Sequence, residues 1–475
     1  MITAISWKNV WRNRSRSLIV IGAVTLGTIS GVFVAGLMKG WVDQRIHAAV
    51  YTEVSHIKIQ NPEYLNNEEI RYTIPDYAKI EKYLNESESV KAWTKHTKIM
   101  AMAGTSRGNT SLMLKGVQPD EEKKVSDLYT KIVEGGGSYF DASFRNPIVI
   151  SEKTADQLRL INYKVTDNLI DSLSQQGAAE KALTALEDFK GKRFRTEKKF
   201  KSALKEVLSE EEIRVHGPVI MKIAKHYKLK SKIVFTFSGV DGEMVYQQFR
   251  VAGIFKTANT MFDQMNAFVL NNDLASVAGF SSTDYHEINM IVNEEESEIQ
   301  AFSENLATTF PSVNVMTWKE LAPDAGMMAD FMQMYYYIIM GVIFFALAFG
   351  IINTMLMAIL ERIKELGMLM AIGMNKKRVF RMIMLETVFL TLTGSIVGMI
   401  LGGLTIAITG TIGLNFASVQ EGFEAFGWSA MVYPSIELSF FFGVTLMVIV
   451  IGILASIVPA RKALKLNPVE AIRIE

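Results

Sequence analysis

Long runs without a charged residue are the strongest pattern in the chain. Four such runs, of 21, 30, 34 and 23 residues, lie in order at Leu18–Met38, Phe331–Leu360, Thr387–Gln420 and Leu438–Ala460. An α-helix rises about 1.5 Å per residue, so roughly 20 residues cross a hydrocarbon core of about 30 Å. The pattern therefore predicts four transmembrane helices. The third run is longer than one crossing needs, so we expect its helix to end near residue 413.

The first run has an alternative interpretation as a cleaved signal peptide. Basic residues precede it, as they do in signal peptides, namely Lys8, Arg12, Arg14 and Arg16. The apolar part of a signal peptide holds about 7–15 residues, whereas this run holds 21. Its length favours a transmembrane helix.

The basic residues between the runs predict the orientation of the helices. Lysine and arginine occur before the first run, between the second and third, and after the fourth, whereas residues 414–437 contain neither and carry three glutamates. Short basic segments stay on the cytoplasmic side of a membrane. We therefore expect both termini and residues 361–386 in the cytoplasm, and residues 39–330 on the extracytoplasmic, periplasmic side.

Residues 39–330 have the pattern of an α+β domain. Short segments rich in Ile and Val, bounded by turn residues, predict strands. They are Ser55–Gln60, Thr97–Ala103, Ser111–Gly116, Pro147–Ile150, Lys232–Ser238, Val245–Phe255, Ala267–Leu270 and Glu287–Val292. Val240-Asp241-Gly242 predicts a hairpin turn, because glycine accepts the positive φ that such turns need. A helical pattern that begins near Glu295 is ended by Pro311.

Residues 166–230 differ from the rest of this domain in composition. The segment favours helix and is dense in charge, with eight basic residues from Lys190 to Lys205 and then three consecutive glutamates at 210–212. We interpret it as a helical insertion in the domain. Its charge fits either an ordinary solvated helix surface or a docking surface for an acidic partner or for lipid headgroups.

The predicted fold is a membrane protein with an α-helical bundle of four transmembrane helices and a large α+β extracytoplasmic domain inserted between helices 1 and 2. In order, the parts are an amphipathic elbow helix at 1–17, helix 1 at 18–38, the extracytoplasmic domain at 39–330 with its insertion at 166–230, helix 2 at 331–360, a cytoplasmic coupling segment at 361–386, helix 3 at 387–413, a short extracytoplasmic loop at 414–437, helix 4 at 438–460 and a cytoplasmic tail at 461–475. This organisation predicts a multi-pass protein of the cell inner membrane.

The composition agrees with a mixture of membrane helices and an aqueous domain. Of the 475 residues, 49% are hydrophobic and the mean hydropathy is +0.18. These values are high for a soluble protein and low for one made only of membrane helices. The net charge of +1 gives no indication of nucleic-acid binding, and the absence of cysteine excludes disulfides and thiolate zinc sites.

The sequence lacks the motifs of common enzymes. It has no G-x-x-x-x-G-K-[ST] run, so this chain cannot hold ATP phosphates in a P-loop. Its six histidines form no H-x-x-x-H or H-E-x-x-H pair. We therefore expect a non-catalytic chain that binds no metal and no cofactor of its own.

The sequence ERIKELGMLMAIGMNKKRVFRMIMLE, at residues 361–386, predicts a helix, a break at Gly373 and a second helix capped by Asn375. Because this segment joins two predicted transmembrane helices, movement of a bound partner would pass directly into both. A short polar-rimmed helix of this kind suits docking into a groove on a cytoplasmic protein. The alternative is an ordinary loop helix that lies on lipid headgroups.

The first of these two helices combines a charged face with an apolar patch. Glu361 and Glu365 are four residues apart and lie on one face. The apolar patch is formed by Leu366, Leu369 and Met370. This arrangement favours the docking interpretation.

The N-terminal segment is amphipathic. Trp7, Val10 and Trp11 can lie at the membrane interface while basic residues face the headgroups, namely Arg12, Arg14 and Arg16. We therefore expect an elbow helix that rests on the cytoplasmic surface of the membrane.

Glycines recur every four residues in the third predicted transmembrane helix, at Gly394, Gly398 and Gly402. Small residues at this spacing let two helices approach closely. Such helices often meet at a subunit interface, so we expect helix packing and a dimer here.

These segments together resemble the permeases of the MacB, FtsX and LolC/LolE superfamily of ABC systems. SWKNVWRNRSRSLIVIGAVTLG is similar to the family's basic elbow helix and first span, and ERIKELGMLMAIG followed by NKKRVFRMIMLE to its coupling helix and the entry to its third span. VPARKALKLNPVEAIR is similar to its C-terminal tail. The order of one span, a large outer domain and three spans is also the family's, so the resemblance covers nearly the whole chain.

The resemblance implies a coupling site and a set of partners. The residues that would couple this chain to an ATPase are Glu361, Arg362, Glu365, Leu366, Gly367, Ala371 and Gly373. The implied partners are a separate cytoplasmic ABC ATPase, which would carry ATP and Mg, a second permease chain in a homo- or heterodimer, membrane lipids, and a periplasmic carrier or adaptor protein.

Within the superfamily, LMLKGVQP at 112–119 and FRVAGIFKTANTMFD at 249–263 look most like the lipoprotein-releasing branch, LolC and LolE. That branch implies ATP-driven release of lipoproteins from the inner membrane. The insertion at 166–230 departs from its pattern. The alternatives are an efflux permease of a split MacB-like tripartite exporter and an FtsX-like signalling subunit that controls a periplasmic hydrolase.

The charge-free spans favour mechanotransmission over alternating access, because a polar-substrate or ion site at mid-membrane usually needs charged residues. ATP binding would close the ATPase pair, push on the coupling segment and move the outer domain. A lipidated substrate would need an apolar cavity near the outer ends of the first two spans. Its candidate lining residues are Phe33, Leu37, Met334, Tyr335 and Ile338.

Overall fold

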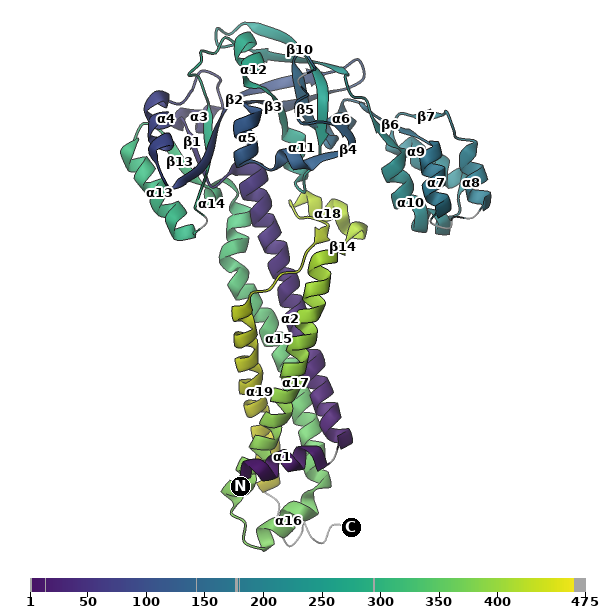
Figure 1. Cartoon of the computed structure of the whole chain (residues 1–475), viewed down its shortest axis with the longest axis vertical. Coiled ribbons are helices and arrows are strands. Elements are labelled where there is room, and N and C mark those ends of the chain that lie inside the picture. The colour runs from purple at the N-terminus through teal and green to yellow at the C-terminus, as the bar shows by residue number, and fades with distance from the viewer. Residues whose placement is uncertain are drawn as a thin grey trace. The chain divides into compact units, whose positions relative to one another are not determined.

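The computed structural model describes residues 2–12, 14–141, 143–175, 178, 180–293 and 295–464. It divides into two compact units (Figure 1). The helical unit comprises residues 1–46, 327–420 and 429–475, and the α+β unit comprises residues 47–326 and 421–428. Of the predicted cytoplasmic tail at 461–475, residues 465–475 lie outside the described part of the chain.

The helical unit is built from long helices. They are α1 (Ile2–Arg12), α2 (Arg14–Ala48), α15 (Pro323–Glu361), α16 (Ile363–Ala371), α17 (Lys376–Ile412) and α19 (Leu438–Leu464). Among the described residues, three stretches of helix are long and apolar enough to cross a membrane, at Ser17–Val54, Met334–Glu361 and Lys376–Ile412. The fourth predicted span falls within α19, which has 27 residues. A membrane crossing by α19 stays a prediction.

Two of the helices extend well beyond their charge-free runs. α2 continues past Met38 for ten residues, and Lys39 forms an ion pair with Asp43 one turn later, at 3.0 Å. α15 begins eight residues before Phe331, with Pro323 as its first residue, a position where proline costs no helical hydrogen bond. The charge-free runs therefore locate the apolar part of each helix but not its ends.

The α+β unit contains most of the strands. They are β1 (Ile57–Gln60), β2 (Val90–Gly104), β3 (Asn109–Val117), β4 (Ile132–Gly137), β5 (Pro147–Ser151), β6 (Ile161–Lys164), β7 (Arg193–Phe194), β8 (Lys225–Tyr227), β9 (Lys232–Ser238), β10 (Met244–Phe255), β11 (Asn266–Leu270), β12 (Glu287–Val292) and β13 (Asn314–Thr317). Each of the eight strand predictions overlaps one of these. The predicted turn joins β9 to β10, and Gly242 has φ +82° there.

The pairing of the strands closes a ring. β2, β3, β11, β5, β10 and β9 pair in that order, and β9 pairs back to β2. The β3–β11 and β5–β10 pairs are parallel. From β2, a second path of antiparallel pairs runs through β12 and β1 to β13. The strands that sequence reasoning missed are short or glycine-rich, such as β4 with the sequence IVEGGG.

Helices surround these strands. They are a π-helix (Ala49–Val54), α3 (Pro62–Asn67), α4 (Tyr77–Glu86), α5 (Pro119–Val125), a 3-10 turn (Leu128–Lys131), α6 (Glu152–Gln157), α7 (Asp167–Gln175), α8 (Glu180–Glu187), α9 (Glu197–Val207), α10 (Glu210–Ala224), α11 (Thr260–Met265), α12 (Asn271–Ala278), α13 (Glu296–Thr309) and α14 (Trp318–Leu321). α13 matches the helix predicted to end before Pro311.

The insertion is not purely helical, which corrects the prediction for residues 166–230. Helices α7 to α10 are present, but β7 and β8 lie within the segment and pair on either side of β6, which precedes it. One hydrophobic cluster runs from Ile150 of β5 through Tyr163 of β6 to Phe200 of α9. The insertion thus shares its core with the rest of the α+β unit, because β6 supplies the side chains that bridge them.

The segment between α17 and α19 is also more than the predicted loop at 414–437. It contains β14 (Leu414–Asn415), a 3-10 turn (Ala417–Val419), α18 (Gln420–Ala425) and β15 (Met431–Val432). Residues 421–428 belong to the α+β unit. Lys256 Nζ lies 2.8 Å from Glu424 Oε1, with both side chains largely buried. Acidic residues in this segment therefore have a structural use that the charge pattern alone did not indicate.

Candidate coupling site and buried charge cluster

The corner between α15 and α17 has the predicted helix, break and cap. α15 ends at Glu361, and α16 runs from Ile363 to Ala371. Gly373 has φ +98°, a left-handed conformation that favours glycine. The side chain of Asn375 then accepts a hydrogen bond from the backbone N–H of Lys377 at 3.0 Å and caps α17.

A chain of ion pairs ties this corner to its neighbours. Arg362 Nη1 donates to Glu386 Oε1 of α17 at 2.8 Å, and Arg362 Nε donates to Glu365 Oε2 of α16 at 3.1 Å. Arg12, at the end of α1, also donates to Glu365. Because the four side chains form one continuous network, α1, α16 and α17 are held together by charge.

The links of this network differ in strength. The side chains of Arg362 and Glu386 are only 18% and 12% exposed, whereas those of Arg12 and Glu365 are 56% and 46% exposed. Removing one partner of a buried pair costs about 3–5 kcal/mol, while an exposed pair contributes about 0–1 kcal/mol. Arg362–Glu386 is therefore the structural link, and Arg12–Glu365 orients α16 with little effect on stability.

Sequence reasoning missed Glu386. It was visible as the single carboxylate between the basic residues 376–381 and the apolar run that starts at Thr387. A pocket of about 310 Å³ opens beside the network and is lined in part by Glu361, Glu365 and Glu386. The pocket is bordered by residues of α1, α2, α15, α16 and α17.

The faces of α16 are arranged differently from the prediction. Leu366 is 3% exposed, and Gly367 is buried as well. Leu369 and Met370 are half-buried against the same core. The predicted apolar docking patch therefore packs inside this chain, which corrects the proposed use of Leu366 and Gly367 as contact residues. Such packing is common where a short helix must be anchored between two longer ones.

The exposed face of α16 offers other groups to a partner. Ile372 is 79% exposed and Met368 is 56% exposed. Lys364, Ala371 and Gly373 are exposed too. Among the predicted coupling residues, Glu361, Glu365, Ala371 and Gly373 are thus placed at the surface.

The elbow helix α1 packs on α17. Ser6 Oγ donates to the carbonyl oxygen of Met382 at 3.2 Å, and Val10 is 1% exposed. Trp7 contacts Phe389 edge to face at a centroid separation of 5.4 Å. Trp7 and Trp11 remain 44% and 42% exposed, as an interfacial position requires, whereas Val10 faces the core. Arg14 is exposed, and the side chain of Arg16 lies outside the described part of the chain.

The glycine stripe of α17 faces α2 of the same chain. A Cβ atom on Gly394 would lie 2.8 Å from Val24 Cβ, and one on Gly398 would lie 2.8 Å from the carbonyl oxygen of Thr25. On Gly402 it would lie 3.0 Å from Val32. The stripe therefore lets two helices of one chain approach closely. A role at a dimer interface stays a prediction.

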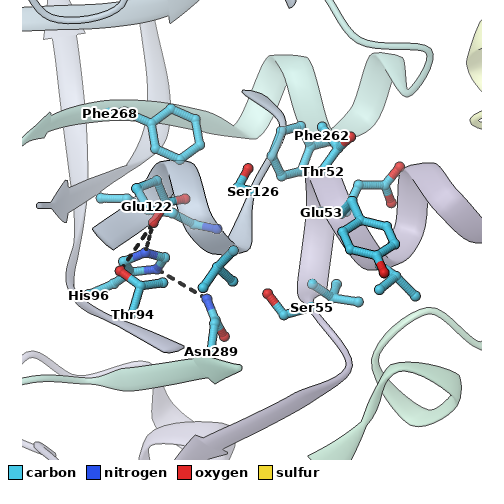
Figure 2. Close-up of a pocket in the computed structure, with 15 residues that line it drawn as sticks. Thr52, Glu53, Ser55, Thr94, His96, Glu122, Ser126, Phe262, Phe268 and Asn289 are labelled. Atoms are coloured by element: carbon cyan, nitrogen blue, oxygen red, sulfur yellow. Dashed lines mark hydrogen bonds and ion pairs between the residues drawn. The ribbon is translucent and has the colours of Figure 1, made fainter. Parts of the chain in front are cut away.

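The five residues predicted to line a substrate cavity lie on the surfaces of α2 and α15. Met334, Tyr335 and Ile338 of α15 are 47%, 48% and 55% exposed, and Phe33 and Leu37 of α2 are half-buried. None of the five lines the pocket at the coupling corner or the cavity in Figure 2. The predicted lipid-binding role of this surface stays a prediction.

The α+β unit contains a cluster of charges that sequence reasoning did not predict. Glu287 of β12 is fully buried, and its Oε2 atom lies 3.4 Å from Lys58 Nζ and 3.2 Å from Lys98 Nζ. Lys115 Nζ lies 4.0 Å from Glu287 Oε1. Burial alone would raise the pKa of Glu287, but the three ammonium groups and His96 hold it well below its usual range.

His96 connects this cluster to α5. Its Nδ1 lies 2.9 Å from Glu287 Oε1 and its Nε2 lies 2.6 Å from Glu122 Oε2. Burial would lower the pKa of His96, but the two carboxylates outweigh it and raise the pKa to about 9. At neutral pH both ring nitrogens therefore carry protons and donate to the carboxylates.

A small cavity lies beside this cluster and is shown in Figure 2, with His96, Glu122 and Asn289 around it. Its volume of about 20 Å³ is enough for a single water molecule. Within the described ranges, no group of three or more His, Asp or Glu side chains is placed to hold a metal ion. The ion pairs of the cluster join β1, β2, β3, β12 and α5.

Residues 337–468 match the family of FtsX-like permease C-terminal domains. The match includes the coupling corner and helices α16 and α17. The family evidence thus covers the segment in which the ion-pair network lies.

The similar curated proteins are ABC transporter permeases. A protein of Methanocaldococcus jannaschii, described as an uncharacterized ABC transporter permease, is 29% identical over 235 residues, which are 48% of this chain and 56% of that protein. The macrolide export ATP-binding/permease protein MacB of Chlorobium luteolum is 32% identical over 126 residues, which are 26% of this chain and 16% of MacB. The alignments therefore span less than two thirds of either relative.

One similar solved structure is the extracellular domain of the noncanonic ABC-type transporter YknZ from Gram-positive bacteria. It is 14% identical, with a TM-score of 0.28, over 55% of this chain and 99% of that chain. A TM-score this low carries no argument about the fold or the function.

Proposed function

We propose that this chain is the membrane permease subunit of an ABC-type complex, driven by a separate ATPase that binds ATP and Mg. The observation that carries this proposal is the coupling corner inside the FtsX-like segment. There, a short helix with an exposed face lies between two long apolar helices, and ion pairs through Arg362 link it to α17. The similarity to ABC transporter permeases supports it.

The corner is suited to transmit force. Arg362 joins the end of α15 to Glu386 of α17, so a push on α16 acts on both helices at once. Gly373 provides the one sharp turn, while the buried Leu366 anchors α16 to the core. In this proposal the movement that ATP binding drives at α16 passes along α2, α15 and α17, and no substrate crosses between these helices.

The proposed placement follows the charge pattern. Both termini and α16 would lie in the cytoplasm of a cell with an inner membrane, and the α+β unit would lie in the periplasm. Two permease chains would bind two ATPase chains. Membrane lipids and a periplasmic carrier or adaptor would be further partners.

The proposed substrate is a lipoprotein released from the inner membrane. The supporting observations are the resemblance of residues 112–119 and 249–263 to the lipoprotein-releasing branch and the exposed apolar side chains at the start of α15. Met334, Tyr335 and Ile338 each expose about half of their surface, and an acyl chain is a ligand that such a surface can bind.

A second candidate function is export in the manner of a split MacB-like pump. The similarity to MacB, a macrolide export protein, favours it. An FtsX-like signalling role that activates a periplasmic hydrolase would use the same coupling corner. The three roles share one mechanical design and differ in what the α+β unit contacts.

Purification of the tagged full chain from its own cells in mild detergent, followed by mass spectrometry, tests the proposal. We expect a P-loop ATPase and a triacylated protein to copurify, and ATP addition to release the latter. A chain with Gly373 replaced by proline, which cannot adopt positive φ, serves as the uncoupled control. Recovery of an outer-membrane channel or a cell-wall hydrolase instead would support the MacB-like or FtsX-like role. Absence of any ATPase would overturn the proposal.

A further inference from the structure

The small sheet of the insertion gathers basic side chains on one face. β6 lies between β7 and β8, beside helices α7 to α10 (Figure 1). Lys164 of β6 pairs directly with Arg193 of β7, and like charges in this position destabilise a sheet. Strand alternation places Tyr163 and Phe194 on the opposite face, where Tyr163 stacks on Phe200 at a centroid separation of 5.4 Å.

Other segments bring further cations to the same place. Lys228 follows β8, and its Nζ donates to the carbonyl oxygen of Arg159 at 3.0 Å. Arg107 lies in the turn between β2 and β3, which contacts the end of α6 through a 3.0 Å hydrogen bond from Thr105 Oγ1 to the carbonyl oxygen of Leu158. We call the whole set the cationic face: Arg107, Arg159, Lys164, Arg193, Arg195 and Lys228.

The cations of this face repel one another. Burial lowers the pKa of Lys228, and the neighbouring Arg107, Arg193 and Arg195 lower it further. Asp156 lies three residues before Arg159 and is exposed, but one carboxylate leaves the six cations in large excess. Such clustering creates a positive local potential that attracts an anionic ligand.

Some basic residues elsewhere in the insertion have acidic partners. Lys190 Nζ lies 2.7 Å from Asp167 Oδ1, and Lys201 Nζ lies 2.6 Å from Glu197 Oε1. Within the part of the chain that the structure describes, no carboxylate lies within ion-pair distance of any member of the cationic face. Lys198, Lys199 and Lys205 of α9 also lack such a carboxylate among the described residues, so the distinguishing feature of the cationic face is that its cations lie close to one another.

A buried amide on β6 is also incompletely paired. Asn162 is 4% exposed, and its side-chain oxygen has no hydrogen-bond partner among the described residues. It lies two residues before Lys164, so strand alternation places both on the same side of β6. A buried polar atom without a partner costs free energy. Because an amide oxygen accepts hydrogen bonds, a water molecule bound with the ligand would satisfy it, whereas a phosphate oxygen would not.

We propose that the cationic face binds a ligand with clustered phosphate groups, either a phosphorylated lipid headgroup or a soluble phosphate polymer. Four of its six members are arginines, whose planar guanidinium groups pair with phosphate through two parallel hydrogen bonds. A phosphate monoester carries nearly two negative charges and three acceptor oxygens, which suits a dense cluster of donors. Binding requires neither the ATPase nor transport, so it is independent of the proposed function.

Binding of polyphosphate to the full chain in zwitterionic nanodiscs tests the proposal. We expect salt-sensitive binding that weakens by about tenfold or more in the triple variant Arg107→Gln, Arg193→Gln, Arg195→Gln. The control variant Lys198→Gln, Lys199→Gln, Lys205→Gln removes the same charge from exposed positions of α9 and should stay within about twofold of the natural chain. Vesicles of phosphatidylcholine with and without a multiply phosphorylated lipid distinguish the two sources of phosphate.

Three results would overturn the proposal. They are an equal loss in the control variant, tighter binding of polyglutamate than of polyphosphate, and no binding of either phosphate probe at physiological salt. Thermal stability separates a binding role from a structural one. Removing mutually repelling arginines should leave the melting temperature unchanged or raise it, whereas a lower melting temperature would show that these arginines hold the fold together.

Discussion

Replacing Glu287 with glutamine destabilises the α+β unit by about 3–5 kcal/mol. Glutamine keeps the shape of the side chain but removes the buried carboxylate that faces Lys58, Lys98 and His96. The remaining cations are then buried with too little negative charge beside them. Hydrogen–deuterium exchange of the full chain should show this as lost protection in peptides from β1, β2 and β12.

A glutamate on the protein surface provides the control for Glu287→Gln. Glu206→Gln, on the surface of α9, should change stability by less than about 0.5 kcal/mol. Unchanged protection in the Glu287→Gln chain would show that the charge cluster is not what holds these strands together.

The same cluster makes the stability of the α+β unit depend on pH. The pKa of His96 is raised to about 9 in the folded chain, from an ordinary value of about 6.5. Protonated His96 therefore makes its full contribution to the free energy of unfolding below a pH of about 6.5. This contribution is lost as the pH rises through about 9. Glu287→Gln should weaken this dependence, because one of the two carboxylates that raise the pKa is gone.

Replacing Glu361 and Glu365 with lysine uncouples ATP hydrolysis from transport. Lysine at 365 would lie beside Arg12 and Arg362, so attraction between α1 and α16 becomes repulsion. Coupling free energies between sites are about 1–3 kcal/mol, so we expect substrate release per ATP to fall by about 5–150-fold. Because the Arg12–Glu365 pair is exposed, the amount of folded chain in the membrane should stay the same.

A charge swap shows how these residues act. Arg12→Glu combined with Glu365→Arg restores the ion pair with reversed polarity. Recovery of transport would show that the pair acts by orienting α16. Continued loss would show that the negative charge at 365 is itself required, for its ion pair with Arg362 or for a contact with the ATPase. If the Glu361→Lys, Glu365→Lys chain hydrolysed ATP and released substrate at the same rates as the unsubstituted chain, a coupling role for this corner would be contradicted.

The helices of this chain are predictable from sequence for a simple physical reason. A run of 21 or more uncharged residues is rare in soluble proteins and therefore indicates a membrane helix. Gly373 followed by Asn375 indicates the end of one helix and the start of the next. The eight predicted strands were found because β-branched residues and turns bracket them. β6, β7 and β8 were missed because each has only two to four residues and is stabilised by pairing partners that are distant in sequence.

The charged sites were harder to predict because their meaning depends on tertiary packing. Thr94, His96 and Lys98 lie on one face of β2 and make it polar, a pattern that indicates a solvated face. In the structure α5 covers that face, so His96 and Lys98 are buried beside Glu287. Leu366 shows the converse, since an exposed docking patch and an internal anchor have the same helical pattern.

Cysteine labelling in intact cells tests the central claim most directly. The chain has no native cysteine, so any labelling of a single-cysteine variant reports the side of the membrane on which that position lies. The two positions are Lys198 of the insertion and Lys377 near Gly373. With a membrane-impermeant maleimide, our account predicts labelling of the Lys198→Cys chain and none of the Lys377→Cys chain until the cells are lysed. Labelling of Lys377→Cys in intact cells, with protection of Lys198→Cys, would place the coupling corner away from ATP and contradict the account.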